Sequence, residues 1–178
     1  MEAANLGGGV GVSDVREQAG RRHRAGRPGP DLVVSKLCPP PLRPGTVRRS
    51  RLIERLARGD LRPIVSVVAP PGYGKTTLLS QWAERSGQSF AWVSVDDADN
   101  DPKVLLAYVA EALDAVEPID ERVFGALASP ASSVPGSVVP RLGSAFASMS
   151  TPVVLASCMP WPRGWRCTRP TRRAPVRN

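Results

Sequence analysis

The stretch Ala69-Pro-Pro-Gly-Tyr-Gly-Lys-Thr-Thr77 decides the fold of this chain. It follows the apolar run Ile64-Val-Ser-Val-Val68, which predicts a β-strand, and it precedes the helical pattern of residues 78–85. A strand, a glycine-containing loop with Lys and Thr, and a helix, in that order, are typical of a loop that cradles phosphate groups. A plain Gly/Pro turn would explain neither the lysine nor the paired threonines. The stretch therefore predicts a phosphate-binding loop, called the phosphate loop below.

Each residue type in the phosphate loop has a physical role in holding a polyphosphate. The backbone N–H groups from Gly72 to Thr77 can turn inward, and the positive end of the following helix dipole faces the anion. Gly72 and Gly74 permit backbone conformations and close approaches that a Cβ would obstruct. We expect Lys75 to reach the β- and γ-phosphates, the Thr76 hydroxyl to coordinate Mg²⁺ and Thr77 to lie near the α-phosphate.

The phosphate loop departs from the common pattern at its first position, which holds Ala69 in place of glycine. That position ends the predicted strand, where a small side chain suffices. Pro70 and Pro71 donate no N–H, but they precede the donors that matter. The nucleotide-binding residues predicted here are Ala69, Pro70, Pro71, Gly72, Tyr73, Gly74, Lys75, Thr76 and Thr77.

The charge of the chain is concentrated at its ends. Its 178 residues suit one domain, and its net charge is +8. Residues 1–30 carry five Arg against three acids, residues 31–155 carry 13 basic and 13 acidic side chains, and residues 156–178 carry six Arg and no acid. The part expected to fold is therefore neutral, which argues against a nucleic-acid-binding domain.

Three cysteines without a CxxC and a single histidine predict neither a metal site nor a disulfide framework. No apolar run is long enough to span a membrane, and the Gly-rich start lacks the pattern of a secretory signal. We therefore expect a cytoplasmic protein without a membrane partner.

The chain before the phosphate loop divides into a leader and a segment that contains a helix. Residues 1–30 are rich in Gly and Arg with little to bury, so we predict a disordered leader; a basic nucleic-acid arm is the alternative. Residues 36–45 predict a proline-fixed extended segment. Residues 47–58 predict a short packed helix with arginines around Leu52, Ile53 and Leu56, and a DNA-reading helix is the alternative there.

Beyond the phosphate loop, helix and strand patterns alternate, which predicts an α/β fold with a parallel sheet. The almost continuously apolar run of residues 90–95 predicts a strand buried on both faces, and Asp101 with Pro102 predicts the start of a helix. We expect residues 114–137 to be irregular, residues 138–149 to be helical and residues 151–155 to begin another strand. Apolar stripes at helical spacing are formed by Leu78, Leu79, Trp82 and Ala83, and by Leu105, Val109, Ala112 and Leu113.

The acidic stretch Asp96-Asp-Ala-Asp-Asn-Asp101 invites two functional interpretations. A calcium loop requires Gly and Glu at places that are held here by Pro102 and Tyr108, so that interpretation fails. In the other interpretation, Asp96 and Asp97 end a strand and hold Mg²⁺. A solvated turn with a helix cap explains the acids as well, and both remain open at this point.

Residues 31–155 resemble the amino-terminal part of the large ATP-binding LuxR-type transcriptional regulators, the maltose-activator-like branch of the AAA-type STAND ATPases. The resemblance rests on Lys36-Leu37, Pro39-Pro40, Val47, Arg49, Leu52, the stretch 69–78, Gln81-Trp82, Ala91-Trp92 and the stretch 96–102. It implies a P-loop NTPase domain that binds ATP or ADP with Mg²⁺, with Val47 and Arg49 beside the adenine. In that family, nucleotide occupancy switches an autoinhibited regulator into an oligomeric activator.

The resemblance also implies a third strand that ends in paired Mg²⁺-holding acids. Residues 152–155 match the start of that strand, and Ala156-Ser-Cys158 stand where the acids should appear. We therefore expect an incomplete P-loop NTPase, truncated before the sensor and helix-turn-helix regions, that binds ATP or ADP with little hydrolysis and has no catalytic residue of its own. DNA contacts would belong to the missing regions.

Residues 156–178 are rich in Pro, Arg and Trp and have no periodicity, so we predict a disordered or out-of-frame tail. The alternative is a small ATPase that uses Asp96 and Asp97 for Mg²⁺ and binds nucleic acid through this tail, with Trp161 and Trp165 stacked on bases. In the family-type sheet, the strand at residues 64–68 pairs with a later strand, so we expect its edge to be unpaired here.

Overall fold

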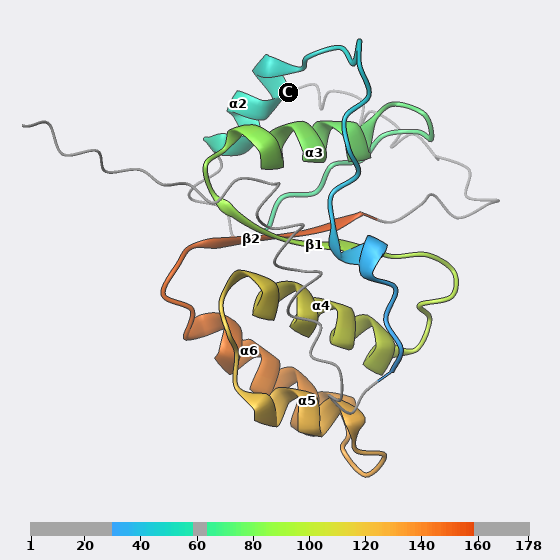
Figure 1. Cartoon of the computed structure of the whole chain (residues 1–178), viewed down its shortest axis with the longest axis vertical. Coiled ribbons are helices and arrows are strands. Elements are labelled where there is room, and N and C mark those ends of the chain that lie inside the picture. Colours follow the sequence, from blue (N-terminus) through green and yellow to red (C-terminus); the bar gives the residue numbers. More distant parts are fainter. Residues whose placement is uncertain (1–29, 59–63, 159–178) are drawn as a thin grey trace, which may run out of the picture.

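Two parallel strands divide the chain into two helical layers in the computed structural model, which describes residues 30–58 and 64–158 (Figure 1). In chain order the elements are the 3-10 helix η1 (Val34–Leu37), α2 (Ser50–Ala57), α3 (Lys75–Arg85), β1 (Ser89–Ser94), α4 (Pro102–Val116), α5 (Glu121–Ala128), the π-helix η2 (Val134–Val138), α6 (Val139–Ala147) and β2 (Val153–Cys158). Most of the predicted leader and tail lies outside the described residues.

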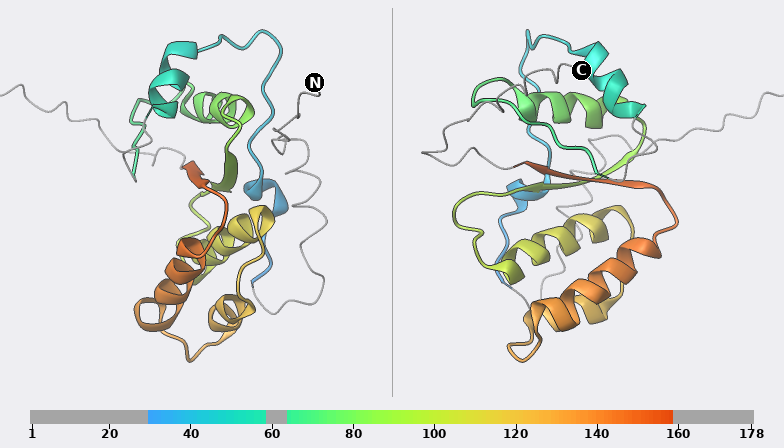
Figure 2. Two further views of the ribbon diagram at one scale, coloured as in Figure 1. Left: turned by 90° about the vertical axis from the view of Figure 1, so that its left-hand side faces the viewer. Right: turned by 180° about the vertical axis from the view of Figure 1, so that it is seen from behind.

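The sheet confirms the predicted α/β class with parallel strands. β1 pairs with β2 in parallel, from Ser89 opposite Val153 to Ser94 opposite Cys158. Helices α2 and α3 lie on one side of the sheet, and α4, α5 and α6 lie on the other (Figures 1 and 2). The four central residues of β1 are buried, as expected for a continuously apolar strand with helices on both faces.

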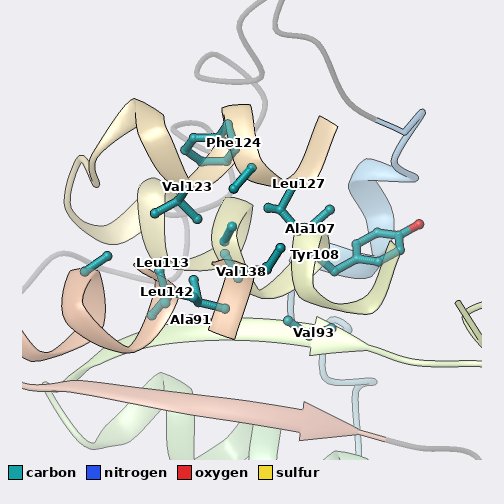
Figure 3. Close-up of a cluster of buried hydrophobic side chains, with 14 of the residues drawn as sticks. Ala91, Val93, Ala107, Tyr108, Leu113, Val123, Phe124, Leu127, Val138 and Leu142 are labelled. Atoms are coloured by element: carbon teal, nitrogen blue, oxygen red, sulfur yellow. The ribbon is translucent and has the colours of Figure 1, made fainter. Parts of the chain in front are cut away.

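Alternate side chains of β1 pack into two separate hydrophobic cores, because successive side chains of a strand point to opposite faces. Ala91 and Val93 face α4, α5 and α6, where Leu113 and Val123 are almost fully buried (Figure 3). The second core lies under α2 and α3 and contains Ile53, Leu78, Trp82, Ala83, Phe90, Trp92 and Ala156. The rings of Trp82 and Phe90 meet edge to face with their centroids 5.0 Å apart.

The start of α4 and the apolar stripe of α3 are confirmed. The Asp101 carboxylate accepts a hydrogen bond of 2.7 Å from the Lys103 N–H, and Pro102 is the first helical residue. Of the predicted α3 stripe, Leu78, Trp82 and Ala83 are buried and Leu79 packs against the same core. The cap of α4 and the apolar stripe of α3 each depend on residues close together in the sequence, so the sequence pattern was sufficient to predict them.

The prediction of a strand at residues 64–68 was wrong, because in the described part of the chain no strand pairs with them. Ile64 is 85% exposed and Val68 is 73% exposed, while Val67 packs against the core under α3. A strand exists only as part of a hydrogen-bonded ladder, so an apolar pattern alone cannot make one.

Three other boundaries differ from the predictions. The helix expected over residues 47–58 is confined to α2, which leaves Val47 and Arg49 outside it. The region expected to be irregular contains α5, which is capped by the Asp120 carboxylate and buries Val123 and Phe124. β2 continues to Cys158, three residues past the predicted change of character. No helix in the described ranges is long and apolar enough to cross a membrane.

Lys36 fastens the amino-terminal segment to the acidic loop after β1. Its ammonium donates to both carboxylate oxygens of Asp99, at 2.9 and 2.8 Å, and lies 2.9 Å from the Asp96 carboxylate. The same ammonium lies 5.3 Å from the centre of the Tyr108 ring, whose hydroxyl accepts from the Val33 N–H. The acids of this loop therefore have a structural partner that the local sequence pattern did not indicate.

The ion pairs shift the pKa values of two of these groups. Burial alone would lower the pKa of Lys36, but its hydrogen bonds with Asp99 and Asp96 outweigh burial and raise that pKa above the ordinary 10.5. Hydrogen bonds from Lys36 and from the Ala98 N–H lower the pKa of Asp96 below the ordinary 3.8. The ionised Asp96 carboxylate therefore stabilises the fold above pH 3.8, and this stabilisation is lost as the pH falls through the folded-state pKa of Asp96. The Lys36 ammonium stabilises the fold below pH 10.5, and this stabilisation is lost as the pH rises through the folded-state pKa of Lys36.

We predict that Lys36→Met lowers the free energy of unfolding by about 3 kcal/mol near neutral pH, because it leaves the buried Asp99 carboxylate without its cation. It should also flatten the pH dependence of stability at both ends of the range. Urea unfolding between pH 3 and pH 11 measures both effects. Lys103→Met is the control, since Lys103 donates to the Ser129 carbonyl and not to a carboxylate. An unchanged pH profile in Lys36→Met would contradict this account.

Candidate phosphate-binding site

The phosphate loop turns through two left-handed glycines directly into α3. Gly72 has φ 81° and Gly74 has φ 74°, a region that residues with a Cβ rarely adopt. Gly74 is also the residue before the first helical position, so the turn and the helix start share one glycine. The first N–H groups of an α-helix have no carbonyl partner within the helix, so they can donate to a ligand. This arrangement can hold an anion at the amino-terminal end of α3.

The Lys75 ammonium lies within the turn of the phosphate loop. It donates to the carbonyl of Ala69 at 2.7 Å and to that of Pro70 at 3.1 Å. The Tyr73 N–H donates to the same Pro70 carbonyl at 3.4 Å, which closes the turn. The residues predicted for phosphate binding therefore form a turn that leads into the first residues of α3, with the Lys75 ammonium bound to carbonyls of the same turn.

Thr76 connects the start of α3 to the end of β2. Its Oγ1 lies 2.7 Å from the Cys158 Sγ, so residues 82 apart in sequence meet beside the phosphate loop. Cys158 ends β2, at the place where the resemblance implies the Mg²⁺-holding acids. It therefore lies beside Thr76, the predicted Mg²⁺ ligand. That strand end presents a thiol in place of a carboxylate.

The residues at this position do not fit Mg²⁺ well. Mg²⁺ prefers oxygen ligands, whereas a thiol suits softer metals. No group of three or more His, Cys, Asp or Glu side chains able to hold a metal occurs among residues 30–58 and 64–158. The Asp96 carboxylate, proposed above as an alternative Mg²⁺ ligand, is bound to Lys36. Thr76 therefore remains the one predicted ligand with a hard oxygen beside the phosphate loop.

A buried glutamine of α3 binds the segment that contains Val47 and Arg49, and Arg49 reaches the phosphate loop. The Gln81 side-chain amide donates to the Val47 carbonyl at 2.9 Å and accepts from the Arg49 N–H at 3.1 Å. The Arg49 guanidinium lies against the loop, because a Cβ built on Gly74 would be 3.3 Å from its Nη2. The sequence motif named Gln81 but gave it no role. Its position among the apolar residues of α3 is the signal that could have identified it.

Comparison with known proteins finds similarity to parts of much longer proteins. The chain is 35% identical over 107 residues to the serine/threonine-protein kinase PknK of Mycobacterium tuberculosis, a match that covers 56% of this chain and 10% of that protein. It is 42% identical over 83 residues to the HTH-type transcriptional regulator MalT of Serratia proteamaculans, which covers 46% of this chain and 9% of that regulator. MalT of Cronobacter sakazakii is 38% identical over 82 residues, with the same coverage.

The chain thus spans about a tenth of the length of these curated relatives. No family model matches it, and no solved structure matches it. The relatives support the resemblance to large regulators, with one of them described as a kinase and the others as transcriptional regulators.

We predict that Gly74→Ala and Gly87→Ala destabilise the fold by a similar amount, about 1–2 kcal/mol each. Both glycines are left-handed, with φ 74° and 63°, and a Cβ is penalised there. A Cβ at Gly87 meets no atom within 4 Å, whereas one at Gly74 meets the flexible end of Arg49, which can move aside. Urea unfolding of the two variants measures the comparison. A cost for Gly74→Ala several times that for Gly87→Ala would show that Arg49 is rigidly held.

Proposed function

We propose that this chain binds the polyphosphate of ATP or ADP through the phosphate loop, as the nucleotide-binding segment of a LuxR-type STAND regulator. The observation that carries the proposal is the geometry of residues 72–75. Two left-handed glycines lead straight into the positive end of α3, and the Lys75 ammonium lies over the same turn. Backbone N–H groups, a helix dipole and one cation are what a polyphosphate requires at close range.

In this proposal the nucleoside lies on the side of Val47 and Arg49. Val47 is 76% exposed, so its side chain offers an apolar surface to a base. The Arg49 guanidinium lies against Gly74 and provides a second cation beside Lys75. A planar guanidinium can stack on an aromatic ring or donate to phosphate oxygens.

We propose that hydrolysis is slow. Phosphoryl transfer depends on positioning and on neutralising charge, and metal ions that bridge the phosphates do much of that work. Mg²⁺ bound with ATP would find the Thr76 hydroxyl here, but the neighbouring group is the Cys158 thiol. Binding depends less on the metal, because the charge-assisted hydrogen bonds of the loop and Lys75 contribute roughly 1.5–3 kcal/mol each.

The regulatory part of the proposal rests on the similarity to MalT, which is described as an HTH-type transcriptional regulator. In that context nucleotide binding would act as a signal, and DNA binding and oligomerisation would belong to other regions of a longer regulator. The alternative of an ATPase that uses Asp96 and Asp97 for Mg²⁺ is disfavoured, because the Asp96 carboxylate is already bound to Lys36.

We predict that the purified chain binds ATP and ADP, and that Lys75→Ala weakens both by roughly 10- to 150-fold. Isothermal titration with each nucleotide measures the affinities, and circular dichroism verifies that the variant is folded. Lys103→Ala is the matched control, because Lys103 lies on α4 and donates to the Ser129 carbonyl. Equal affinities for the wild type and Lys75→Ala would refute nucleotide binding through this loop.

We predict that Cys158→Asp makes ATP binding depend on Mg²⁺. The carboxylate would stand beside the Thr76 hydroxyl and supply a hard oxygen ligand, so adding Mg²⁺ should tighten ATP binding by about tenfold in this variant. In the wild type, Mg²⁺ should have a smaller effect. Ser157→Asp is the control, because adjacent strand residues point to opposite faces and Ser157 is exposed. The same response to Mg²⁺ in all three proteins would disprove the assignment of Cys158 to the metal position.

A further inference from the structure

Gln81 is buried in the middle of α3 with both ends of its amide satisfied by one short segment. Its side chain is 3% exposed, and its neighbours Leu78, Trp82 and Ala83 belong to the hydrophobic core under α2. A buried amide is costly unless its donor and its acceptor both find partners. Here the partners are the Val47 carbonyl and the Arg49 N–H, at 2.9 and 3.1 Å. We call these two hydrogen bonds the Gln81 clamp.

We propose that Gln81 is a positioning residue, and that the Gln81 clamp sets the preference of the site for a nucleotide over a bare polyphosphate. The proposal rests on the proposed function, because it assigns the nucleoside half of that ligand to the clamped segment. Gln81 itself would touch no part of the ligand. It would act through Val47 and Arg49, the second of which reaches the phosphate loop at Gly74.

The clamp fixes the segment at two points two residues apart. The Gln81 amide donates to one backbone group of the segment and accepts from another, as the backbone of a neighbouring strand would. The two hydrogen bonds fix both the position and the direction of the segment. The Arg49 carbonyl in turn accepts from the Leu52 and Ile53 N–H groups at the start of α2. The position of α2 therefore depends on the same point.

The clamp also connects the segment to the helix that follows the phosphate loop. Gln81 lies on α3, the helix that follows the phosphate loop. Arg49 binds Gln81 through its backbone N–H and places its guanidinium against Gly74 of the loop. A nucleotide held by the loop would therefore meet the clamped segment at a fixed distance. A bare polyphosphate lacks the nucleoside that this segment would contact, so its affinity should be insensitive to the exposed Val47 side chain.

A purely structural role would join α2 to α3 without affecting ligand preference. The two roles differ in one measurable ratio, the affinity for ATP divided by the affinity for tripolyphosphate. Gln81→Met removes both hydrogen bonds while keeping a side chain of similar length in the core. Gln81→Glu keeps the shape and the acceptor for the Arg49 N–H, and its ionised carboxylate cannot donate to the Val47 carbonyl, so above the pKa of this carboxyl it tests the clamp without a change in volume.

The experiment titrates the full chain with ATP and with tripolyphosphate by isothermal calorimetry, with circular dichroism as the check on folding. We expect the ratio to fall about tenfold in Gln81→Met and to fall in Gln81→Glu as well, from the loss of one or two hydrogen bonds. Lys75→Ala should weaken both ligands and leave the ratio nearly unchanged. Gln88→Met, in the exposed turn before β1, is the matched control and should leave both affinities unchanged.

Failure of the clamp and failure of the proposed function give different results. If the wild type prefers ATP and the ratio stays at the wild-type value in folded Gln81→Glu, Gln81 only joins the helices and the proposal is overturned while nucleotide binding stands. If the wild type binds both ligands equally, the clamped segment contacts no nucleoside and the proposal is overturned as well. If the wild type binds neither, the proposed function fails and the clamp has no ligand to position.

Discussion

The parallel pairing of β1 with β2 is the constraint on which the rest of the structure depends. Because the strands run in the same direction, the end of β2 lies at the same edge of the sheet as the acidic loop that follows β1. α3 packs on this sheet through Leu78 and Trp82, which brings its first turn to that edge. The contact between Thr76 and Cys158 follows from the same arrangement. The site is thus assembled by the sheet and not by the phosphate loop alone.

At this edge Lys75 and Arg49 lie against the phosphate loop, and two aspartates of the loop after β1 bind Lys36. The loop after β1 is acidic, and the single ammonium of Lys36 binds the carboxylates of both Asp96 and the buried Asp99. β2 ends in a thiol beside Thr76. On the other side, Lys75 and Arg49 both lie against the loop. The two cations favour holding a polyanion, and the thiol offers no hard oxygen ligand for a metal ion. These two features are the physical basis for proposing binding without turnover.

The sequence predicted those features whose causes are local. The continuous apolar run gave β1, the Asp101-Pro102 pair gave the start of α4, and the loop glycines gave the turn into α3. α5 was missed because the Pro- and Ser-rich composition around it hid the Asp120 cap and the apolar pair Val123 and Phe124. The strand at residues 64–68 was predicted wrongly because a strand needs a neighbour, which no local pattern reveals. The partners of Lys36 and Gln81 lie 63 and 32–34 residues away, and only the folded chain brings them together.

These distant contacts also decide how a ligand at the phosphate loop could be sensed elsewhere. The loop is short and open, with Tyr73 exposed, so its own packing transmits little. Gln81 and Arg49 instead connect it to the start of α2 through hydrogen bonds, one end of which is buried in the core. Buried hydrogen bonds hold one geometry because leaving them unpaired is costly. In the proposed function, a nucleotide would therefore bias the position of α2 by its contacts with the clamped segment, and the loop would contribute affinity without carrying the signal.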